Sequence, residues 1–140
     1  MNAYVDTSVV VKLLVEEPGS ERAAILWDSA DIVVGSRLLY VETRAALAAA
    51  RRATRLTAAQ HRRTMADFDG LWAQMIVVEV SPELVAHAAV LAESERLRGY
   101  DAVHLASALL VGVDLMATSD VTLATAASRH GLHVGNPDFR

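Results

Sequence analysis

Short apolar runs alternate along the chain with longer segments in which apolar residues recur at helical spacing. The short runs predict strands at residues 4–5, 32–34, 76–80, 115–117 and 132–134. The segments between them predict helices over residues 9–15, about 38–55, 57–74, 101–110 and 120–129, with two more that start at Ser20 and Pro82. Short continuous apolar strands separated by helices are typical of a mostly parallel sheet covered on both faces. The sequence therefore predicts a three-layer α/β/α sandwich.

Polar residues, glycine and proline at the segment ends predict where these elements begin and stop. Residues 57–60 have the capping-box pattern, and residues 81–82 place a serine cap before a first-turn proline. Ser20 is expected to cap its own helix in a similar way. Residues 35–36, Gly-Ser, are expected to form a turn after the strand at 32–34.

The length of 140 residues is sufficient to bury a core without disulfides or a structural metal, and we expect one domain spanning residues 1–140. The chain has no cysteine, which excludes disulfides, thiolate zinc sites and a cysteine nucleophile. Its longest apolar stretch, which ends at Asp114, is well short of the ~20 residues that span a bilayer. The first residues also lack the basic start of a signal peptide. We therefore expect a cytoplasmic protein with no membrane contact.

The formal net charge is −4, from 13 Lys and Arg against 17 Asp and Glu, which excludes a nucleic-acid binder driven by overall positive charge. From Arg37 to Arg63, however, seven arginines and one acid give +6, so the remainder carries −10. Because the guanidinium group pairs with phosphate and stacks on unpaired bases, Arg51, Arg52 and Arg55 are candidates for nucleic-acid contact. A solvated helix surface explains the same charges, and the sequence leaves both interpretations open.

Four acidic residues lie where chemistry is expected on such a fold. Asp6 directly follows the first strand and Asp120 follows the strand at 115–117, and ligands collect beyond the carboxyl ends of parallel strands. Asp101 opens an otherwise apolar helix, and Glu42 lies in the first turns of another. If all four converge, their mutual repulsion favours bound divalent cations, and an all-oxygen site suits Mg²⁺ or Mn²⁺.

Each of these acids also has a purely structural interpretation. The three aspartates could accept the free N–H groups at helix starts, where a negative charge also suits the helix dipole. Glu42 could pair with Arg44 or Arg37 on the protein surface. From spacing alone, a metal site and a set of caps and ion pairs both remain open.

Three further features have a functional and a structural interpretation. His104 lies three residues after Asp101, so it could orient a carboxylate or contact nucleic acid, or be a buried structural histidine. Lys12, the only lysine, could lie near a substrate phosphate or suit the dipole at the end of a short helix. A stripe of large apolar residues at helical spacing is interpreted as core: Met65, Phe68, Trp72 and Met75.

Four short motifs carry a resemblance to a known family. They are YVDTSVVVKL at residues 4–13, SRLLYVE at 36–42, YDAVHLA at 100–106 and ATSDVTL at 117–123. In this order and at these separations they resemble the motifs of PIN-domain ribonucleases and, more closely, the VapC toxins of bacterial toxin–antitoxin pairs. The resemblance implies a PIN-like parallel sheet between helices, supporting roles for Ser8 and Ser119, and catalytic acids that bind Mg²⁺ or Mn²⁺: Asp6, Glu42, Asp101 and Asp120.

The resemblance also implies an activity and partners. The expected reaction is endonucleolytic cleavage of RNA, which a small cognate antitoxin of the VapB type suppresses. One or two cations held by the acids would activate water for in-line attack on phosphorus, leaving 5′-phosphate and 3′-hydroxyl ends. We also expect a homodimer, and an antitoxin-binding groove lined by the helices over residues 38–74.

Two other functions compete with this hypothesis. One is a phosphoacceptor signalling module with Asp6 as the acceptor and Thr118 or Ser119 nearby. Such modules need a second acid beside the first-strand acid, whereas Thr7 and Ser8 follow Asp6 here. The other is a catalytically inactive PIN-like module that only binds RNA, and the presence of all four acids argues against it.

Overall fold

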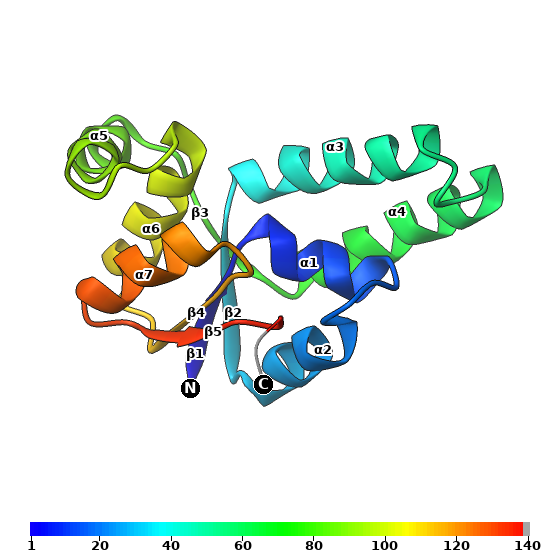
Figure 1. Ribbon diagram of the computed structural model, residues 1–140, viewed down its shortest axis with the longest axis horizontal. Helices are drawn as coiled ribbons and strands as arrows, with labels where there is room; N and C mark the ends of the chain where they lie inside the picture. The colour runs from blue at the N-terminus through cyan, green and yellow to red at the C-terminus, as the bar shows by residue number, and fades with distance from the viewer. Residues whose placement is uncertain (139–140) are drawn as a thin grey trace.

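A wholly parallel five-stranded sheet forms the centre of the computed structural model, which describes residues 1–138 (Figure 1). The strands lie in the order β3-β2-β1-β4-β5. Their bounds are β1 (Asn2–Val5), β2 (Ile32–Ser36), β3 (Ile76–Val78), β4 (Leu115–Ala117) and β5 (His133–Gly135). In the centre of the sheet, Tyr4 lies opposite Val34 on one side and Met116 on the other. The predicted parallel sheet is confirmed.

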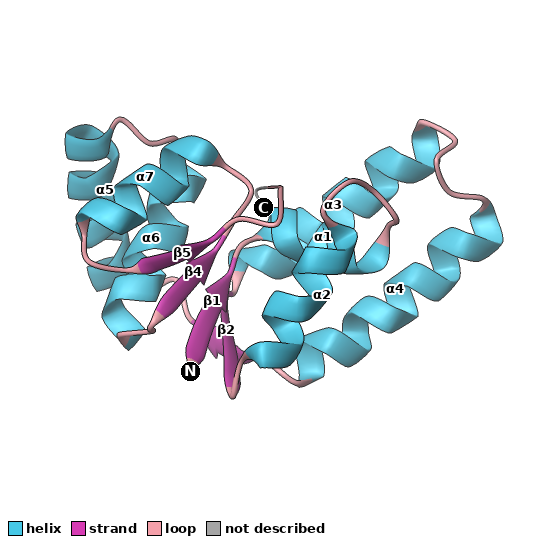
Figure 2. Ribbon diagram, turned by 60° about the horizontal axis from the view of Figure 1, so that its bottom comes forward, coloured by secondary structure: helices cyan, strands magenta, loops and turns pink. Residues whose placement is uncertain are grey.

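Helices cover both faces of this sheet (Figures 1 and 2). One face carries α5 (Pro82–Glu95), α6 (Gly99–Val111) and α7 (Val121–Arg129), and Leu105 of α6 shares a buried cluster with Tyr4. The other side carries α1 (Thr7–Leu14), α2 (Ser20–Ser29), α3 (Leu38–Arg52) and α4 (Ala58–Ala73), and Val9 of α1 shares a second cluster with Val5. The two buried clusters on opposite faces confirm the predicted three-layer α/β/α sandwich.

Helices α3 and α4 form a hairpin that extends away from the sheet (Figure 1). Its turn contains Thr54 in the left-handed region at φ 59°, and α4 then begins at the predicted capping box of Thr57 and Gln60. The predicted core stripe of α4 is confirmed: Phe68 is buried, and its ring lies 5.2 Å from that of Tyr40 on α3. Of the other stripe residues, Met75 is buried in the same cluster, and Met65 and Trp72 are partly buried and pack against it. Aromatic packing therefore holds the hairpin together.

The predicted cap of α2 is wrong. The N-cap residue is Gly19, at φ 93°, and Ser20 is the first helical residue. The Ser20 hydroxyl donates to the Val15 carbonyl and accepts from the Glu17 N–H, so it closes the loop between α1 and α2. A left-handed cap position suits glycine, whose lack of a Cβ removes the steric penalty.

The predicted turn at Gly35 and Ser36 is also wrong, because both residues continue β2 and pair with β3. A Cβ at position 35 would meet the end of the Met75 side chain, which would have to shift to make room. Neighbouring boundaries move by a few residues: α3 ends at Arg52, and Val80 lies outside β3.

The sheet order determines which loops meet. Because β1 and β4 are neighbours in parallel register, with Val5 opposite Ala117, the residues that follow them emerge side by side at the same sheet edge. Asp6 follows β1 and Thr118 follows β4.

Within residues 1–138, no helix combines the length and the apolar character needed to cross a membrane.

Candidate functional site

Asp6 lies at the centre of the site, between the end of β1 and the start of α1. Its Oδ1 accepts from the Ser8 hydroxyl and the Val9 N–H, and its Oδ2 accepts from the Thr118 hydroxyl. The residue is 5% exposed. Burial raises the pKa of Asp6, and His104 together with the hydrogen-bond donors offsets only part of that rise. The protein therefore stabilises the ionised carboxylate of Asp6 less well than water would.

Asp101 and Asp120 lie close to each other, on the first turn of α6 and at the N-cap of α7. Asp120 Oδ1 accepts from the Leu123 N–H at 2.9 Å, so the predicted cap interpretation is correct for this oxygen. Arg98 donates from Nε to Asp101 Oδ2 at 3.0 Å and from Nη2 to Asp120 Oδ2 at 3.2 Å. Burial raises the pKa of Asp101; the hydrogen bond from Arg98 lowers it, and the charge of Asp120 raises it further. The two aspartates thus share one guanidinium group.

Glu42 is positioned by contacts from α1 and α6. Its Oε1 accepts from the Thr7 hydroxyl at 3.0 Å and lies 2.7 Å from His104 Nε2. His104 is 2% exposed, and its Nδ1 lies 2.6 Å from the Tyr4 hydroxyl. Both sequence-based interpretations of His104 therefore hold together, because it is a buried histidine that also orients a carboxylate.

The predicted surface pairing of Glu42 is not found. Arg37 instead pairs with Glu79, and Arg44 donates to the Tyr40 hydroxyl. Glu42 is turned toward the sheet edge, where Thr7 and His104 hold it.

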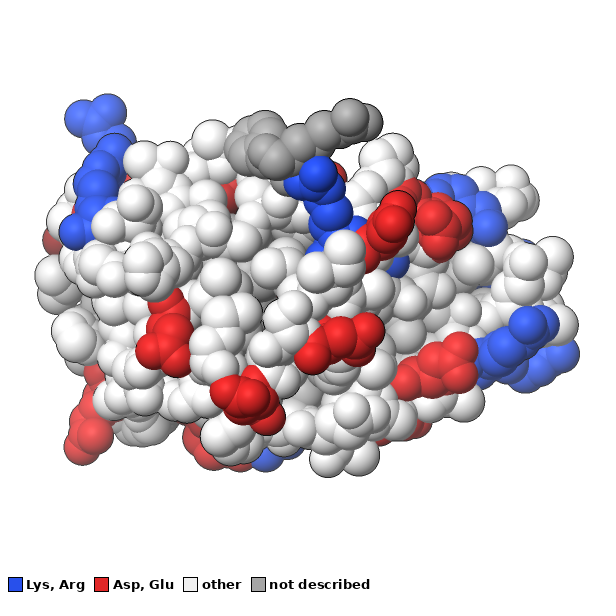
Figure 3. Space-filling model, turned by 90° about the horizontal axis from the view of Figure 1, so that it is seen from below, with Lys and Arg blue, Asp and Glu red and all other residues white. Residues whose placement is uncertain are grey.

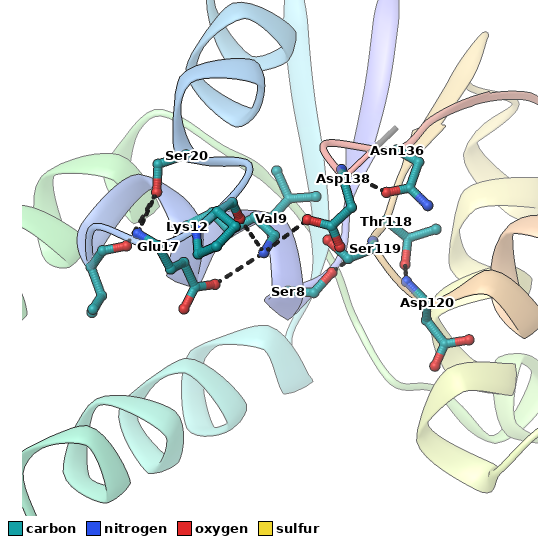
Figure 4. Close-up of polar contacts among 12 residues, drawn as sticks. Ser8, Val9, Lys12, Glu17, Ser20, Thr118, Ser119, Asp120, Asn136 and Asp138 are labelled. Atoms are coloured by element: carbon teal, nitrogen blue, oxygen red, sulfur yellow. Dashed lines mark hydrogen bonds and ion pairs between the residues drawn. The ribbon is translucent and has the colours of Figure 1, made fainter. Parts of the chain in front are cut away.

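Hydroxyl groups connect the acids across the edge of the sheet. Thr118 donates to Asp6 and accepts from the Asp120 N–H, so one side chain joins two of the four acids. Ser8 donates to Asp6. The Ser8 hydroxyl also accepts from the Ser119 N–H at 3.0 Å, and Figure 4 shows these two serines side by side. The Ser119 hydroxyl oxygen is buried and has no hydrogen-bond partner among the described residues. Ser8 is thus a direct support of Asp6, whereas Ser119 contributes through its backbone.

Sequence reasoning missed two residues of this network. The sequence hypotheses place Thr118 only beside a phosphoacceptor, although its position directly after the apolar run at residues 115–117 is a usable signal. Arg98 gave no signal, because its contact with Asp120 depends on how α6 and α7 pack.

The four acids offer a donor set that fits a hard divalent cation. All the side-chain donors are carboxylate oxygens, which Mg²⁺ and Mn²⁺ prefer. Burial raises the pKa of both Asp6 and Asp101, which means that the protein stabilises their negative charge only in part. A bound cation would stabilise that negative charge further. Across residues 1–138, however, no three acidic or histidine side chains are already grouped as a metal site. Arg98 and His104 occupy contacts with three of the four acids instead.

The structure does not bring the candidate arginines to the acids. Arg51 and Arg52 lie in the last turn of α3, nine residues or more beyond Glu42, which separates them by about 13 Å along the helix. Arg55 pairs with Glu17 at 3.1 Å. Basic side chains show beside acidic ones at the hairpin end of the face seen in Figure 3. Any contact of these arginines with nucleic acid would therefore lie away from the acids.

Lys12 forms a second polar cluster beside the site. Its Nζ lies 3.2 Å from Glu17 and 3.3 Å from Asp138, and it donates to the Pro18 carbonyl (Figure 4). Only 10% of the side chain is exposed. Lys12 thus joins the end of α1 to the α1–α2 loop and the C-terminal segment, which agrees with a structural interpretation.

Comparison with known proteins gives concordant matches. The sequence profile described as "PIN domain" matches residues 3–128. Ribonuclease VapC45 of Mycobacterium tuberculosis (strain CDC 1551 / Oshkosh) is 45% identical over 132 residues, which cover 94% of this chain and 87% of that protein. The crystal structure of Mycobacterium tuberculosis VapC20, a sarcin-ricin loop cleaving toxin, has a TM-score of 0.68 at 21% identity, covering 99% of this chain and 98% of that one. A chain of a toxin–antitoxin complex from Klebsiella pneumoniae has a TM-score of 0.69 at 16% identity, with coverages of 96% and 97%.

Proposed function

The chain belongs to the PIN domain family, and on that premise we propose that it is a VapC-type toxin whose acids hold divalent cations for the hydrolysis of RNA. One observation carries the assignment of the site. Three acids, Asp6, Asp101 and Asp120, are linked through Thr118 and Arg98 at the carboxyl edge of a parallel sheet, where ligands of such folds bind. The fourth acid, Glu42, is held beside them by Thr7, the residue after Asp6, and by His104 on the helix that carries Asp101.

The protein's own residues orient these carboxylates. Ser8 and Thr118 fix the two oxygens of Asp6, and Thr7 and His104 fix one oxygen of Glu42. Such outer contacts orient metal ligands and are typically worth 10- to 100-fold in metal affinity or activity. When bound, Mg²⁺ or Mn²⁺ supplies Lewis-acid stabilisation of charge on the phosphodiester and makes water more acidic. No side chain is needed as a nucleophile, and we expect 5′-phosphate and 3′-hydroxyl ends.

Metal dependence is the first prediction. The purified chain, freed of any co-expressed partner, should cleave total cellular RNA in Mg²⁺ or Mn²⁺ and should stop when EDTA removes the cation, because four carboxylates alone would repel the phosphate. Electrophoresis of the RNA and end-labelling of the products would measure both cleavage and end chemistry. Full cleavage in EDTA, at the rate seen with Mg²⁺, would contradict a cation-dependent site.

The same protein provides a test of the phosphoacceptor alternative. Both carboxylate oxygens of Asp6 accept hydrogen bonds and the residue is nearly buried, which leaves little room for an incoming phosphoryl group. Incubation with acetyl phosphate and Mg²⁺, followed by intact mass measurement, should therefore show no added phosphate. A stable adduct on Asp6 would favour that alternative.

We propose that a small cognate antitoxin of the VapB type binds the α3–α4 hairpin and that the chain forms a homodimer. The antitoxin proposal is supported by a groove on the hairpin. This groove has a volume of about 730 Å³ and is lined by Arg37, Leu38, Tyr40, Val41, Asp69 and Trp72. Val41 is 61% exposed there, and Arg37 lies over the Trp72 ring. A groove with an apolar floor and charged rim suits an amphipathic helix of a partner.

The groove gives the second prediction. Val41→Asp should prevent co-purification of the product of the neighbouring short gene, because a carboxylate would be buried unpaired under the partner's apolar face. Val90→Asp on α5, at a matched 62% exposure, is the control and should retain the partner. Co-expression, growth measurement and sedimentation would report partner binding, toxicity and oligomeric state. Unchanged partner binding by the Val41 variant, or harmless expression of the wild-type chain alone as a monomer, would contradict this assignment.

The basic end of the hairpin gives the third prediction. Charge reversal at Arg51, Arg52 and Arg55 should weaken RNA binding and flatten its salt dependence, because each lost phosphate contact lowers the slope of log K against log salt by ~0.7 for a single strand. Arg96→Glu, an exposed arginine at the end of α5, is the control. Filter binding over a series of salt concentrations would measure the slopes. An unchanged slope would mean that these arginines only solvate the hairpin or contact the antitoxin.

A further inference from the structure

Arg98 links two acids of the proposed metal site. It is the N-cap residue of α6, and its guanidinium lies 3.0 Å from Asp101 Oδ2 through Nε and 3.2 Å from Asp120 Oδ2 through Nη2. The two carboxylates belong to different helices, and their Oδ2 atoms contact the same guanidinium, so two like charges lie close together. A cation between them is therefore favourable, and here that cation belongs to the protein itself.

For Asp120, the oxygen that Arg98 contacts is the one that a metal ion would need. Asp120 Oδ1 already accepts from the Leu123 N–H, so Oδ2 is the more available oxygen of that carboxylate. Arg98 contacts this Oδ2 and also the Oδ2 of Asp101. A divalent ion that coordinates both carboxylates through these oxygens would compete with the guanidinium for the same space and the same charge.

Arg98 is held loosely enough to give way. Its side chain is 64% exposed, whereas those of Asp101 and Asp120 are 11% and 28% exposed. It lies over the ring of Tyr100, with Cζ 4.9 Å from the ring centroid, at the solvent side of the acids. Ion pairs of an exposed guanidinium are weak because water solvates the free group well. A divalent cation carries twice the charge of the guanidinium and would therefore attract the two carboxylates more strongly at the same distance.

We propose that Arg98 is the internal counter-ion of the metal-free site, which holds Asp101 and Asp120 together and which a divalent cation must displace to bind them both. This inference rests on the proposed function, since it assumes that the two acids are metal ligands. It makes Arg98 a residue that determines metal affinity rather than a catalytic one. Two effects of opposite sign follow from removing the guanidinium. The metal-free protein loses stability because the acids repel, and the metal binds more tightly because its competitor is gone.

The test measures Mn²⁺ binding and metal-free stability on the full chain. Isothermal titration calorimetry of Arg98→Gln should show Mn²⁺ affinity about three- to tenfold tighter than wild type, as expected for the loss of two weak ion pairs. Its thermal midpoint in EDTA should fall. Arg96→Gln, an exposed arginine two residues earlier, is the matched control and should leave both quantities unchanged. A residue with a merely structural role would weaken metal binding when removed, so unchanged or weaker Mn²⁺ affinity in Arg98→Gln overturns the inference.

A second variant keeps the test decisive if Arg98→Gln does not fold. Arg98→Lys retains the charge but cannot bridge both acids, so its Mn²⁺ affinity should rise by a smaller factor, and an unchanged affinity there would also overturn the inference. The RNA cleavage assay in the same buffer separates the two claims. Normal cleavage without an effect of Arg98 on Mn²⁺ affinity overturns this inference alone, whereas tighter Mn²⁺ binding by the Arg98 variant with no cleavage by wild type overturns only the proposed function.

Discussion

The Asp6→Asn protein is expected to fold normally and to lose RNA cleavage by about a thousandfold, as the removal of ~4 kcal/mol of metal-dependent stabilisation of the transition state would do. Asp6 is the acid at the centre of the site, and both of its oxygens are already oriented by Ser8, Val9 and Thr118. An amide keeps the size and one acceptor but removes the charge that attracts the cation. Asp101→Asn should lose activity to a similar extent. Initial rates on a defined RNA at saturating Mg²⁺ would measure the loss.

Although Asp6→Asn should lose activity, its stability in EDTA should fall less than that of the wild type as the pH rises to neutral. Burial raises the pKa of Asp6, so the folded protein binds this proton more tightly than the unfolded chain does. The contribution of Asp6 to stability is therefore greatest below its unfolded pKa and is lost as the pH rises through its folded pKa. In EDTA, wild type should lose stability from acidic to neutral pH through this group, and Asp6→Asn should lose less. Thermal midpoints of both proteins in EDTA, measured at acidic and at neutral pH, would show whether the wild type loses more stability than the variant.

Asp67→Asn is the matched control for this experiment, since Asp67 is an exposed acid on α4. It should retain wild-type cleavage and an unchanged pH dependence of stability. Cleavage at the wild-type rate by Asp6→Asn or Asp101→Asn would remove that acid from the site. A large fall in the stability of Asp6→Asn at neutral pH would show that the charge is needed for folding and that the activity test is not specific.

The sequence was sufficient to predict the architecture and the common sheet edge of Asp6 and Asp120, because both depend on local patterns. Short apolar strands alternating with helices predicted the parallel sheet, and the position of Asp6 and Asp120 directly after strands predicted their common edge. The sequence could not decide whether Asp120 is a helix cap or an acid of the site, because a carboxylate has two oxygens and can serve in both ways. One oxygen of Asp120 caps α7 while the other contacts Arg98.

Contacts across the fold are what the sequence could not predict. His104 reaches Glu42 over 62 residues, and Arg98 reaches Asp120 over 22, and neither spacing carries a periodic signal. Charge counting also failed to show that Arg55 pairs with Glu17, an acid outside the basic segment. Side-chain partners of this kind depend on helix packing, which propensity and periodicity do not specify. The assignment of residues 1–140 to one domain stays a prediction.

Phe68→Ala is expected to give the largest loss of stability, about 3–5 kcal/mol, because a buried aromatic ring leaves a cavity that its neighbours fill only partly. Phe68 is fully buried, and its ring lies 5.2 Å from Tyr40 and 6.1 Å from Trp72, so it joins the two helices of the hairpin. Such a loss is a large part of the ~5–15 kcal/mol that stabilises a typical domain. Urea denaturation in EDTA would measure it.

The consequence of that cavity should extend from stability to the site. Tyr40, which loses its packing partner, lies two residues before Glu42 on α3, so a looser hairpin should leave Glu42 less well oriented toward Thr7 and His104. Phe68→Leu is the control, since it keeps most of the buried volume and should cost only ~1 kcal/mol. We therefore expect Phe68→Ala, at a temperature where it is still folded, to cleave RNA more slowly than Phe68→Leu. A loss below ~1 kcal/mol for the alanine variant would mean that this aromatic cluster does not hold the hairpin. A large loss with unchanged cleavage would instead mean that Glu42 is oriented by Thr7 and His104 alone.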